Sequence, residues 1–459
     1  MIREAAMSIF RAGVHAVLPP VFMDDFFDRK GKEIRIGQQW IDTASIGRLV
    51  VLAMGKAAAL MALEWQKKAG DLVQEALVIT KEAHALPALS WPQLEAGHPV
   101  PDAQSLAAGL AVKKLVSSLR EEDLLLVLLS GGASALVADA PEGCSLEDMQ
   151  SFYQLLLASG ASIQEMNAVR KHFSGIKGGQ LARLANNARI EVAVVSDVPG
   201  DDFSVIASGP FFPDSSTIGE VDQTIYRYQL QDQLPPAIAA QLAKIRADAR
   251  YETPKPGDPV FDRITHHLLA TNQTALEAAA QAALQAGYDP VIFQSRLEGE
   301  AREQASVLLA HCLQEMEEVV GREQNAARCF IAGGETTVTL TGNGKGGRNQ
   351  EFVLSLVAAC VESPDLYSRL NFFDFAILSG GTDGTDGPTD AAGALVDHEL
   401  LHRINSVGPD PRPAFINQDA YTYFGSVGGL IKTGPTQTNV MDMVLILLKS
   451  KAAIRPTGS

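Results

Sequence analysis

Three glycine-bearing turns in the sequence have the residue types that bind small anions. LAMGKAA contains Gly55 and Lys56, LLSGGASAL contains the run Ser130-Gly131-Gly132 followed by Ser134, and TGNGKGGRNQE contains Lys345 and Arg348 amid four glycines. Each turn stands between an apolar run and an amphipathic stretch, so it is expected where a strand ends and a helix begins. Helix N-termini offer unpaired N–H groups and a positive dipole there. One such turn is often a plain connector, but three, two of them with cations, favour anion binding.

Carboxylates occur at matching places in the two halves of the chain. Asp197 closes an apolar run and opens SDVPGDD, while Asp383, Asp386 and Asp390 lie in SGGTDGTDGPTDAAG. Acids on glycine-rich loops suit Mg²⁺, which keeps several waters and takes one or two carboxylates together with substrate phosphates. The alternative is that these aspartates form turns or cap helices. Both interpretations remain open from the residues alone.

Two familiar motifs match in letters but not in context. Gly342, Gly344 and Gly347 spell GxGxxG, but the acidic residue at the expected distance, Glu362, follows a predicted helix rather than a strand. The segment from His398 to His402 spells HExxH, but no glutamate follows Glu399 to complete a zinc site, and Gly408-Pro409 ends the helix early. We therefore expect neither dinucleotide binding nor zinc hydrolysis, and interpret the histidines as a polar helix face.

Composition excludes several classes of protein. The net charge of −16 argues against a nucleic-acid partner, which requires clustered cations. Four cysteines without a CxxC pair indicate neither a disulfide framework nor a zinc ribbon. The N-terminal segment is interrupted by Arg3, Glu4 and Arg11, unlike a signal peptide. The longest uncharged run, residues 124–138, is shorter than the roughly 20 apolar residues of a membrane span. We expect a soluble cytoplasmic protein that contacts no membrane.

The length of 459 residues requires at least two cores. Short apolar runs alternate with amphipathic stretches from Leu49 onward, which predicts βα units around a mainly parallel sheet. Residues 251–262, rich in proline and glycine, are the predicted linker between domains at 1–250 and 263–459, with residues 1–45 a helical lead-in that packs on the second domain. A hairpin strand at Thr336–Thr341 predicts a mixed sheet in the second domain. Other strands are predicted at Leu49–Met54, Ala76–Thr80, Leu124–Leu129, Ile190–Ser196, His267–Thr271, Pro290–Gln294, Arg328–Ala332, Phe375–Leu378 and Val440–Leu448. Helices are predicted at Ala57–Lys68, Ala103–Leu119, Leu146–Ser159, Ile176–Ala188, Gln273–Ala286, Glu300–Val320 and Asn349–Val361.

Ten ordered motifs over about 400 residues give the chain a specific resemblance. They are MGKAA, GHPVPD, SGGASAL, NAVRKHFSGIKGG, SDVPGD, IASGP, GGETTVTL, GKGGRNQE, GGTDGTDGPTDAAG and TGPTQTNVMD. The chain resembles the class II glycerate kinases, whose C-terminal half is called the MOFRL domain. It departs from their pattern at Thr336, Thr385 and Gln437. Gln437 stands where the family has glycine, which adopts backbone angles that glutamine resists.

The resemblance implies a Rossmann-like domain and a second α/β domain facing each other across a cleft that holds the site. It further implies ATP, Mg²⁺ and phosphorylation of D-glycerate at its 2-hydroxyl, giving 2-phosphoglycerate. Lys56 and Arg348 would bind the glycerate carboxylate or the transferring phosphoryl group, with Lys345 also at the substrate. The turn Ser130–Ser134 would hold nucleotide phosphates. Asp197 and Asp386 would serve as Mg²⁺ ligand or as base, with the assignment between them open.

Alternatives from other classes are a nicotinamide-dependent hydroxypyruvate reductase and a non-catalytic protein that binds glycerate or another anion. The predicted site residues are divided between the two halves of the chain, so neither half is expected to work alone. The sequence does not indicate the oligomeric state, and a homodimer is one option.

Overall fold

The structure is a computed structural model that describes residues 2–320 and 325–451. The chain forms two compact units. One, which we call the parallel unit, comprises residues 19–196 and 201–269. The other, which we call the mixed unit, comprises the residues up to 18, residues 197–200 and the chain from 270 onward. The chain therefore begins in the mixed unit, builds the parallel unit and then returns to the mixed unit.

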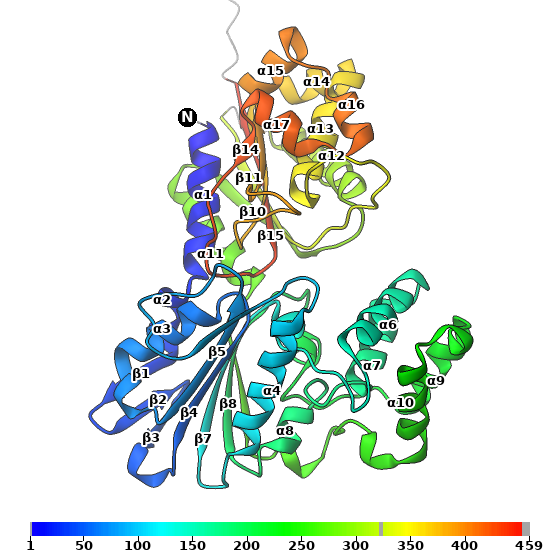
Figure 1. Cartoon of the computed structure of the whole chain (residues 1–459). Coiled ribbons are helices and arrows are strands. Elements are labelled where there is room, and N and C mark those ends of the chain that lie inside the picture. The colour runs from blue at the N-terminus through cyan, green and yellow to red at the C-terminus, as the bar shows by residue number, and fades with distance from the viewer. Residues whose placement is uncertain (1, 321–324, 452–459) are drawn as a thin grey trace, which may run out of the picture. The chain divides into compact units, whose positions relative to one another are not determined.

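The parallel unit is built on a six-stranded sheet (Figure 1). In spatial order its strands are β6 (Gln93–Ala96), β5 (Glu75–Lys81), β4 (Leu49–Met54), β7 (Leu124–Leu129), β8 (Arg189–Val195) and β9 (Ile264–Ala270). From β6 to β8, each strand runs parallel to its neighbours. Every residue of β4 and β7 is buried, as expected for central strands covered on both faces. A separate antiparallel sheet contains β1 (Phe27–Lys30), β2 (Glu33–Ile36) and β3 (Gln39–Asp42).

The helices of the parallel unit fall into two groups. Those associated with the sheet are α2 (Pro19–Phe26), α3 (Ala58–Ala69), α4 (Ala103–Ser117), α5 (Ala133–Leu136) and α8 (Gln180–Leu184). The others, α6 (Leu146–Ala158), α7 (Ile163–His172), α9 (Ile218–Arg227) and α10 (Pro236–Ala247), stand beside the sheet around a core of their own (Figure 1). Phe152, Phe173 and Ile225 are central to that core. The helices α4, α6, α7 and α9 each begin with a capping box, which satisfies N–H groups that a helix start leaves unpaired.

The mixed unit has a six-stranded sheet in which only β10 and β11 are parallel neighbours. In spatial order its strands are β10 (Asp289–Leu297), β11 (Ala327–Gly334), β15 (Asp442–Ser450), β12 (Phe373–Gly381), β13 (Gly393–Asp397) and β14 (Leu430–Ile431). Its helices are α1 (Ile2–Ala16), α11 (Asn272–Gln285), α12 (Ala301–Val320), α13 (Arg348–Glu362), α14 (Pro364–Asn371), α15 (His398–Val407), α16 (Arg412–Asn417) and α17 (Ala420–Val427). Helices α1 and α11 pack together on the sheet, and α12 pairs with α13 over the other face (Figure 1).

Helix α1 belongs to the core of the mixed unit. The segment Ile2–Phe26 has the length and apolar composition of a membrane span. However, Ile9 and Phe10 of α1 are completely or almost completely buried. A Cβ at Gly13 would lie 2.8 Å from the carbonyl oxygen of Ala275, so glycine lets α1 approach α11 closely. The apolar face of α1 is thus accounted for by packing within the unit.

The boundary between the units differs from the predicted linker. Residues 251–262 fold onto the parallel unit, where Thr253 donates to Asp214 at 3.0 Å and the carbonyl of Pro254 accepts from the Asp214 N–H at 2.9 Å. The following strand, β9, then completes the parallel unit's sheet, so the division falls between Leu269 and Ala270. Proline and glycine interrupt helix and strand, but they do not distinguish a linker from a loop packed on its own unit.

Some predicted elements are corrected as well. Thr336–Thr341 forms no strand, and only an isolated bridge between Glu300 and Thr337 occurs there. The mixed character of the sheet comes instead from β12, β13 and β15. The predicted helix Ile176–Ala188 shortens to α8 because Gly178 and Gly179 have positive φ before it. His398 and His402 lie on helix α15, as predicted, and have different neighbours, Asp374 and Tyr367.

Gln437 has a φ of +63°, the left-handed region that glycine adopts without penalty. Its Oε1 atom is also buried with no hydrogen-bond partner. We therefore expect Gln437→Gly to raise the free energy of unfolding by about 1 kcal/mol, observed as a higher Tm in calorimetry.

Gln418 provides a matched control because it has a similar φ of +57°. Its side chain accepts from the N–H groups of Thr341 and Gly342 and donates to the carbonyl of Thr339. Gln418→Gly should lower stability by about 2 kcal/mol, since three hydrogen bonds are lost. A lower Tm for Gln437→Gly would contradict the strain argument.

Candidate functional site

The strand order of the parallel unit reverses between β4 and β7. The chain runs from β4 to β5 and β6 in one direction, and from β7 to β8 and β9 in the other. Open α/β sheets bind ligands outside the carboxyl ends of the strands at such a switch point. The turn with Lys56 follows β4, and the turn that begins at Ser130 follows β7. Two of the three predicted anion-binding turns therefore meet at this point.

A close backbone contact joins these two turns. Gly55 has a φ of +126°, and a Cβ on it would lie 2.2 Å from Ser130 Oγ and 2.4 Å from the Ser130 carbonyl oxygen. The N–H of Lys56 donates to the carbonyl of Gly131 at 2.9 Å. The N–H of Ala57 donates to Ser130 Oγ at 3.0 Å. Gly55 is thus the residue that lets the two turns touch, and the contact fixes the backbone of both.

Ser130 has a structural role in joining the two turns, and its contact with nucleotide stays a prediction. It is completely buried, and its hydroxyl oxygen accepts from Ala57 just before α3 begins. Gly131 is also buried. Gly132, with a φ of +85°, precedes α5 and is partly exposed. Of the predicted phosphate-binding turn, only Gly132 and Ser134 remain available to a ligand.

Ser134 is held by a buried lysine that the sequence analysis did not select. Lys177 Nζ donates to the Ser134 carbonyl oxygen at 2.7 Å and to Ser134 Oγ at 2.5 Å. The Ser134 and Ser208 hydroxyls are 3.0 Å apart. Burial lowers the pKa of Lys177 to about 8, although the charge of Asp139 acts in the opposite direction. A desolvated ammonium group therefore contacts the turn Ser130–Ser134, which we call the SGGAS turn.

The loop around Lys177 has a local sequence signal that could have identified it. Lys177 precedes Gly178 and Gly179, whose N–H groups donate to the carbonyls of Ser208 and Gly209. Ala207 and Ser208 have φ values of +52° and +63°, which are uncommon without glycine. Such strain often accompanies functional sites. The IKGG and IASGP segments are therefore joined by backbone hydrogen bonds beside Ser134.

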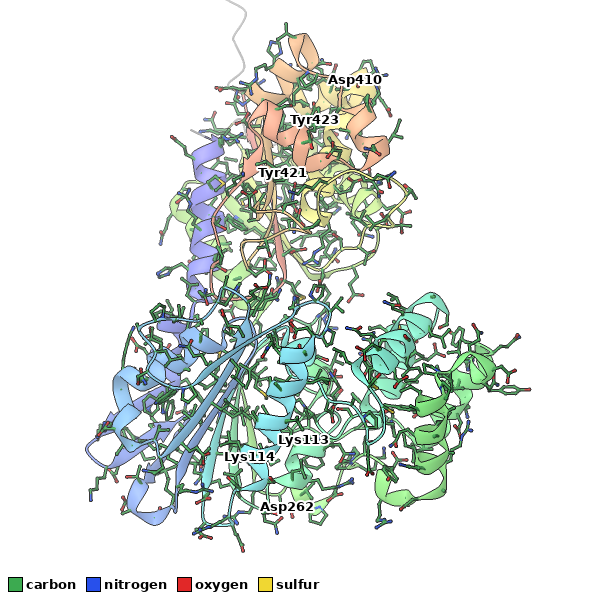
Figure 2. All side chains as sticks on the ribbon, in the orientation of Figure 1. Lys113, Lys114, Asp262, Asp410, Tyr421 and Tyr423 are labelled. Carbon is green, nitrogen blue, oxygen red and sulfur yellow. The ribbon has the colours of Figure 1, made fainter. Side chains whose placement is uncertain are left out.

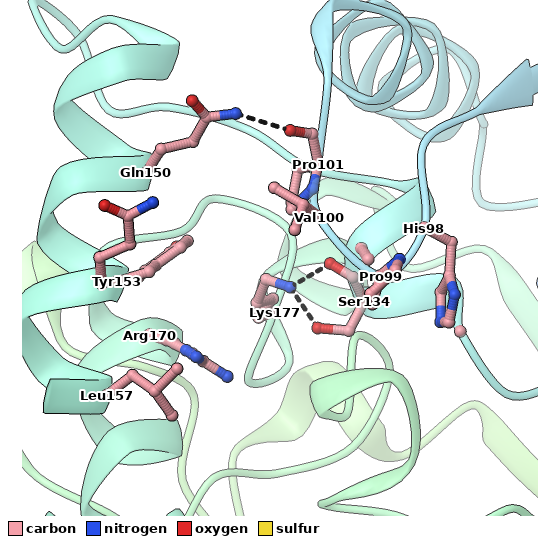
Figure 3. A pocket seen from close by; sticks show the side chains of 13 residues that line it. His98, Pro99, Val100, Pro101, Ser134, Gln150, Tyr153, Leu157, Arg170 and Lys177 are labelled. Atoms are coloured by element: carbon pink, nitrogen blue, oxygen red, sulfur yellow. Dashed lines mark hydrogen bonds between the residues drawn. The ribbon is translucent and has the colours of Figure 1, made fainter. Parts of the chain in front are cut away.

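A pocket of about 400 Å³ opens beside Ser134 and Lys177 (Figure 3). Its walls are the segment 98–101 after β6, the start of α5, and α6, which contributes Tyr153 and Leu157. Arg170 of α7 also lines it. The pocket lies within the parallel unit, on the side of the SGGAS turn that faces α6 and α7.

In the mixed unit, Arg348 is the first residue of α13 and is paired with two acids. Its Nε and Nη2 atoms donate to Asp442 carboxylate oxygens at 2.5 and 3.0 Å, and Nη1 lies 2.7 Å from Glu335 Oε1. Burial alone would lower the pKa of Arg348, but Asp442 and Glu335 raise it above its usual value. Asp442 therefore positions the guanidinium, and Glu335 is its more exposed partner.

The glycine-rich loop before Arg348 is occupied by contacts within its own unit. The N–H of Gly344 donates to the Asn417 carbonyl at 2.8 Å, and a Cβ on Gly342 would lie 2.3 Å from that oxygen. Lys345 is exposed, with its ammonium 4.5 Å from the centre of the Tyr421 ring (Tyr421 is labelled in Figure 2). The loop glycines accommodate the segment 417–419, which gives them a packing role within the unit.

Asp386 anchors the start of α13. It is 3% exposed, and its two oxygens accept from the N–H and side-chain amide groups of Asn349 and Gln350 at 2.8 to 3.3 Å. Burial, with the charge of Asp442, raises its pKa to about 6. A Cβ on Gly347 would lie 2.3 Å from Asp386 Oδ1. The four donors occupy the carboxylate and give Asp386 an anchoring role at the start of α13. Binding of Mg²⁺ by Asp386 stays a prediction.

Asp197 lies two residues after the end of β8 and is half buried. No group of three or more His, Cys, Asp or Glu side chains arranged for a metal occurs within residues 2–320 and 325–451. A magnesium ion bound with substrate phosphates requires only one or two carboxylates. Asp197 therefore stays a predicted candidate for a metal ligand or base.

Asp386→Ala should lower the free energy of unfolding by about 3 kcal/mol or more, because four buried donors lose their acceptor. Asp390→Ala is the control from the same loop. Asp390 is exposed and accepts hydrogen bonds from Tyr421 and Lys432 at the surface, so its loss should change stability far less than the loss of Asp386. Urea unfolding measures both. If Asp386→Ala were as stable as the parent but bound Mg²⁺-ADP more weakly, a metal role would replace the anchoring role.

Comparison with known proteins places the chain in a family. Residues 5–243 match the model of a domain of unknown function, DUF4147, and residues 328–442 match the MOFRL family. The D-glycerate 2-kinase of Thermotoga maritima is 36% identical over 449 residues, which cover 97% of this chain and 98% of that protein. The glycerate 2-kinase of Pyrococcus horikoshii is 36% identical over 445 residues, covering 96% and 94%.

A protein of Agrobacterium vitis provisionally named hydroxypyruvate reductase is 42% identical over 404 residues, covering 88% of this chain and 87% of that protein. The crystal structure of the Thermotoga maritima glycerate kinase matches with a TM-score of 0.79 and 35% identity, covering 97% of this chain and 99% of the other. The Rossmann-like and mixed-sheet units agree with this likeness. The chain therefore belongs to the glycerate 2-kinases of the MOFRL family.

Proposed function

We propose that this protein transfers the γ-phosphoryl group of ATP to the 2-hydroxyl of D-glycerate, releasing ADP and 2-phosphoglycerate. The observation that carries the proposal is the junction of two turns at the switch point of the parallel sheet, where Lys56 and Lys177 supply positive charge. Phosphoryl transfer depends on positioning and on neutralising phosphate oxygens. The family to which the chain belongs supports glycerate as the acceptor.

The proposed roles follow from the surroundings of each residue. Lys56 stabilises negative charge on the transferring group, and Arg348, positioned by Asp442, binds the glycerate carboxylate or that group. An anion would replace Glu335 at Nη1, because the pair with Asp442 uses the other two nitrogens. Asp197 takes the proton of the 2-hydroxyl or binds Mg²⁺. The metal, when bound, neutralises charge on the nucleotide phosphates.

Reduction of hydroxypyruvate is the alternative suggested by the provisional name of the Agrobacterium vitis relative. The contacts of the 342–347 loop argue against it, because its glycines accommodate Asn417 and Asp419. A cytoplasmic location is also part of the proposal. All four cysteines are free, as expected in a reducing compartment.

Purified protein with Mg²⁺-ATP should release ADP only when D-glycerate is added, measured by coupled oxidation of reduced nicotinamide. Phosphorus NMR of the product should show 2-phosphoglycerate. A parallel assay with hydroxypyruvate and reduced nicotinamide, without coupling enzymes, should show no oxidation. Glycerate-independent ADP release, or reductase activity without ATP, would contradict the proposal.

Arg348→Lys should lower kcat by about 10³-fold, nearly as much as Arg348→Ala. A single ammonium cannot keep two bonds to Asp442 and still hold an anion, and this loss corresponds to roughly 4 kcal/mol. Arg412→Lys is the matched control. Arg412 makes a similar two-bond pair with Asp410 at the surface of the same unit, and kcat should be unchanged. Parental turnover in Arg348→Lys would show that Arg348 serves structure alone.

A further inference from the structure

The pocket beside Ser134 contains two cations without acidic partners. Lys177 is 5% exposed, and within residues 2–320 and 325–451 no carboxylate forms an ion pair with it or with Arg170. The nearby acids are engaged elsewhere, since Asp139 pairs with Lys113 and Asp214 pairs with Lys171. Desolvation opposes a buried charge, and the pKa of Lys177 falls to about 8. A bound anion would supply the missing negative charge.

Arg170 has an unsatisfied donor beside the same pocket. Its Nε is buried without a hydrogen-bond partner, and its guanidinium lies 5.1 Å from the centre of the Tyr153 ring. The ring orients the guanidinium but accepts no conventional hydrogen bond from Nε. In Figure 3, Arg170 and Lys177 both extend into the space between α6 and the SGGAS turn. Together they form a site for an anion with several oxygens.

Apolar side chains complete the pocket on the outer side. Val100 and Leu157 line the pocket and are 62% and 67% exposed, so they offer apolar surface to a ligand. Gln150 is fixed by donating to the Pro101 carbonyl at 2.9 Å, which holds the segment 98–101 against α6. A volume of about 400 Å³ lies in the range of small-molecule sites. An anion with a flat apolar end matches this combination of charge and surface.

We propose that this pocket binds the nucleotide, with its phosphates at Lys177 and Arg170 and its base against Val100 and Leu157. The inference rests on the proposed function and names the donor subsite within it. Glycerate and its phosphorylated product are smaller and lack an apolar ring, so they would leave the outer wall uncovered. Ser134, held by Lys177, faces the phosphates from the SGGAS turn.

Isothermal calorimetry with Mg²⁺-ADP tests the assignment without requiring turnover. Lys177→Met and Arg170→Met should each raise the Kd for ADP by about 10- to 100-fold, the loss expected for one charge-assisted hydrogen bond. Leu157→Glu should weaken ADP to a similar extent by placing a carboxylate at the base. Leu110→Glu is the control, because Leu110 of α4 is 68% exposed and does not line the pocket. Its Kd should equal that of the parent.

Each variant is also titrated with 2-phosphoglycerate and with inorganic phosphate. Affinity for ADP that stays at the parental value in both Lys177→Met and Leu157→Glu would overturn the proposal, as would a loss confined to 2-phosphoglycerate. The same holds if the parent binds no ADP. Leu157→Glu keeps the test decisive if Lys177→Met fails to fold, because its position is on the surface. Parental ADP binding that depends on the pocket, without glycerate-dependent ADP release, would contradict the proposed function and leave the subsite standing.

Discussion

The contact of Gly55 with Ser130 is the constraint on which the parallel unit's site depends. The turns after β4 and β7 can meet at the switch point only if one lacks a side chain, because a Cβ on Gly55 would overlap Ser130. Once the turns meet, the N–H groups of Lys56 and Ala57 donate hydrogen bonds to Gly131 and Ser130. These hydrogen bonds fix the backbone of Lys56 and the start of α3. The geometry available to an anion is therefore set by backbone packing before any ligand binds. Such preorganisation lowers the cost of binding charge.

The same principle applies at Arg348, with a carboxylate in place of a glycine contact. Asp386 fixes the first N–H groups of α13, and Asp442 fixes the guanidinium of the residue that begins the helix. Asp386 acts on the helix backbone, as an acid near a helix N-terminus does favourably. Asp386 and Asp442 thus orient the start of α13 and the Arg348 side chain. The abundance of acids around the site reflects this support as well as any metal.

Sequence reasoning identified the elements whose patterns are local. The bounds of β4 and β7 coincide with the predicted runs, since an uninterrupted apolar stretch between breakers marks a buried parallel strand. Strands β13 and β14 were missed because they are short and owe their pairing to partners distant in sequence. The family motifs predicted the two-unit α/β fold, which the structure confirms. The buried contact of Ser130 could not be predicted, and the sequence left open whether Asp386 caps a helix or binds a metal. A loop sequence does not reveal whether a polar group faces a ligand or a neighbouring backbone.

Whether a cation has an acidic partner separates structural groups from candidate binding groups here, and only the folded structure reveals it. Lys171 and Lys177 are six positions apart, similarly buried and both in the NAVRKHFSGIKGG motif. Lys171 pairs with Asp214, whereas Lys177 has the hydroxyl and carbonyl of Ser134 alone. A neutral pair is complete without a ligand, but a solitary buried ammonium remains underpaired at neutral pH. In a chain with a net charge of −16, acids to neutralise Lys177 are plentiful, and the fold directs them elsewhere. That arrangement makes the pocket less stable when it is empty than when an anion fills it. This difference in free energy is what a binding site requires.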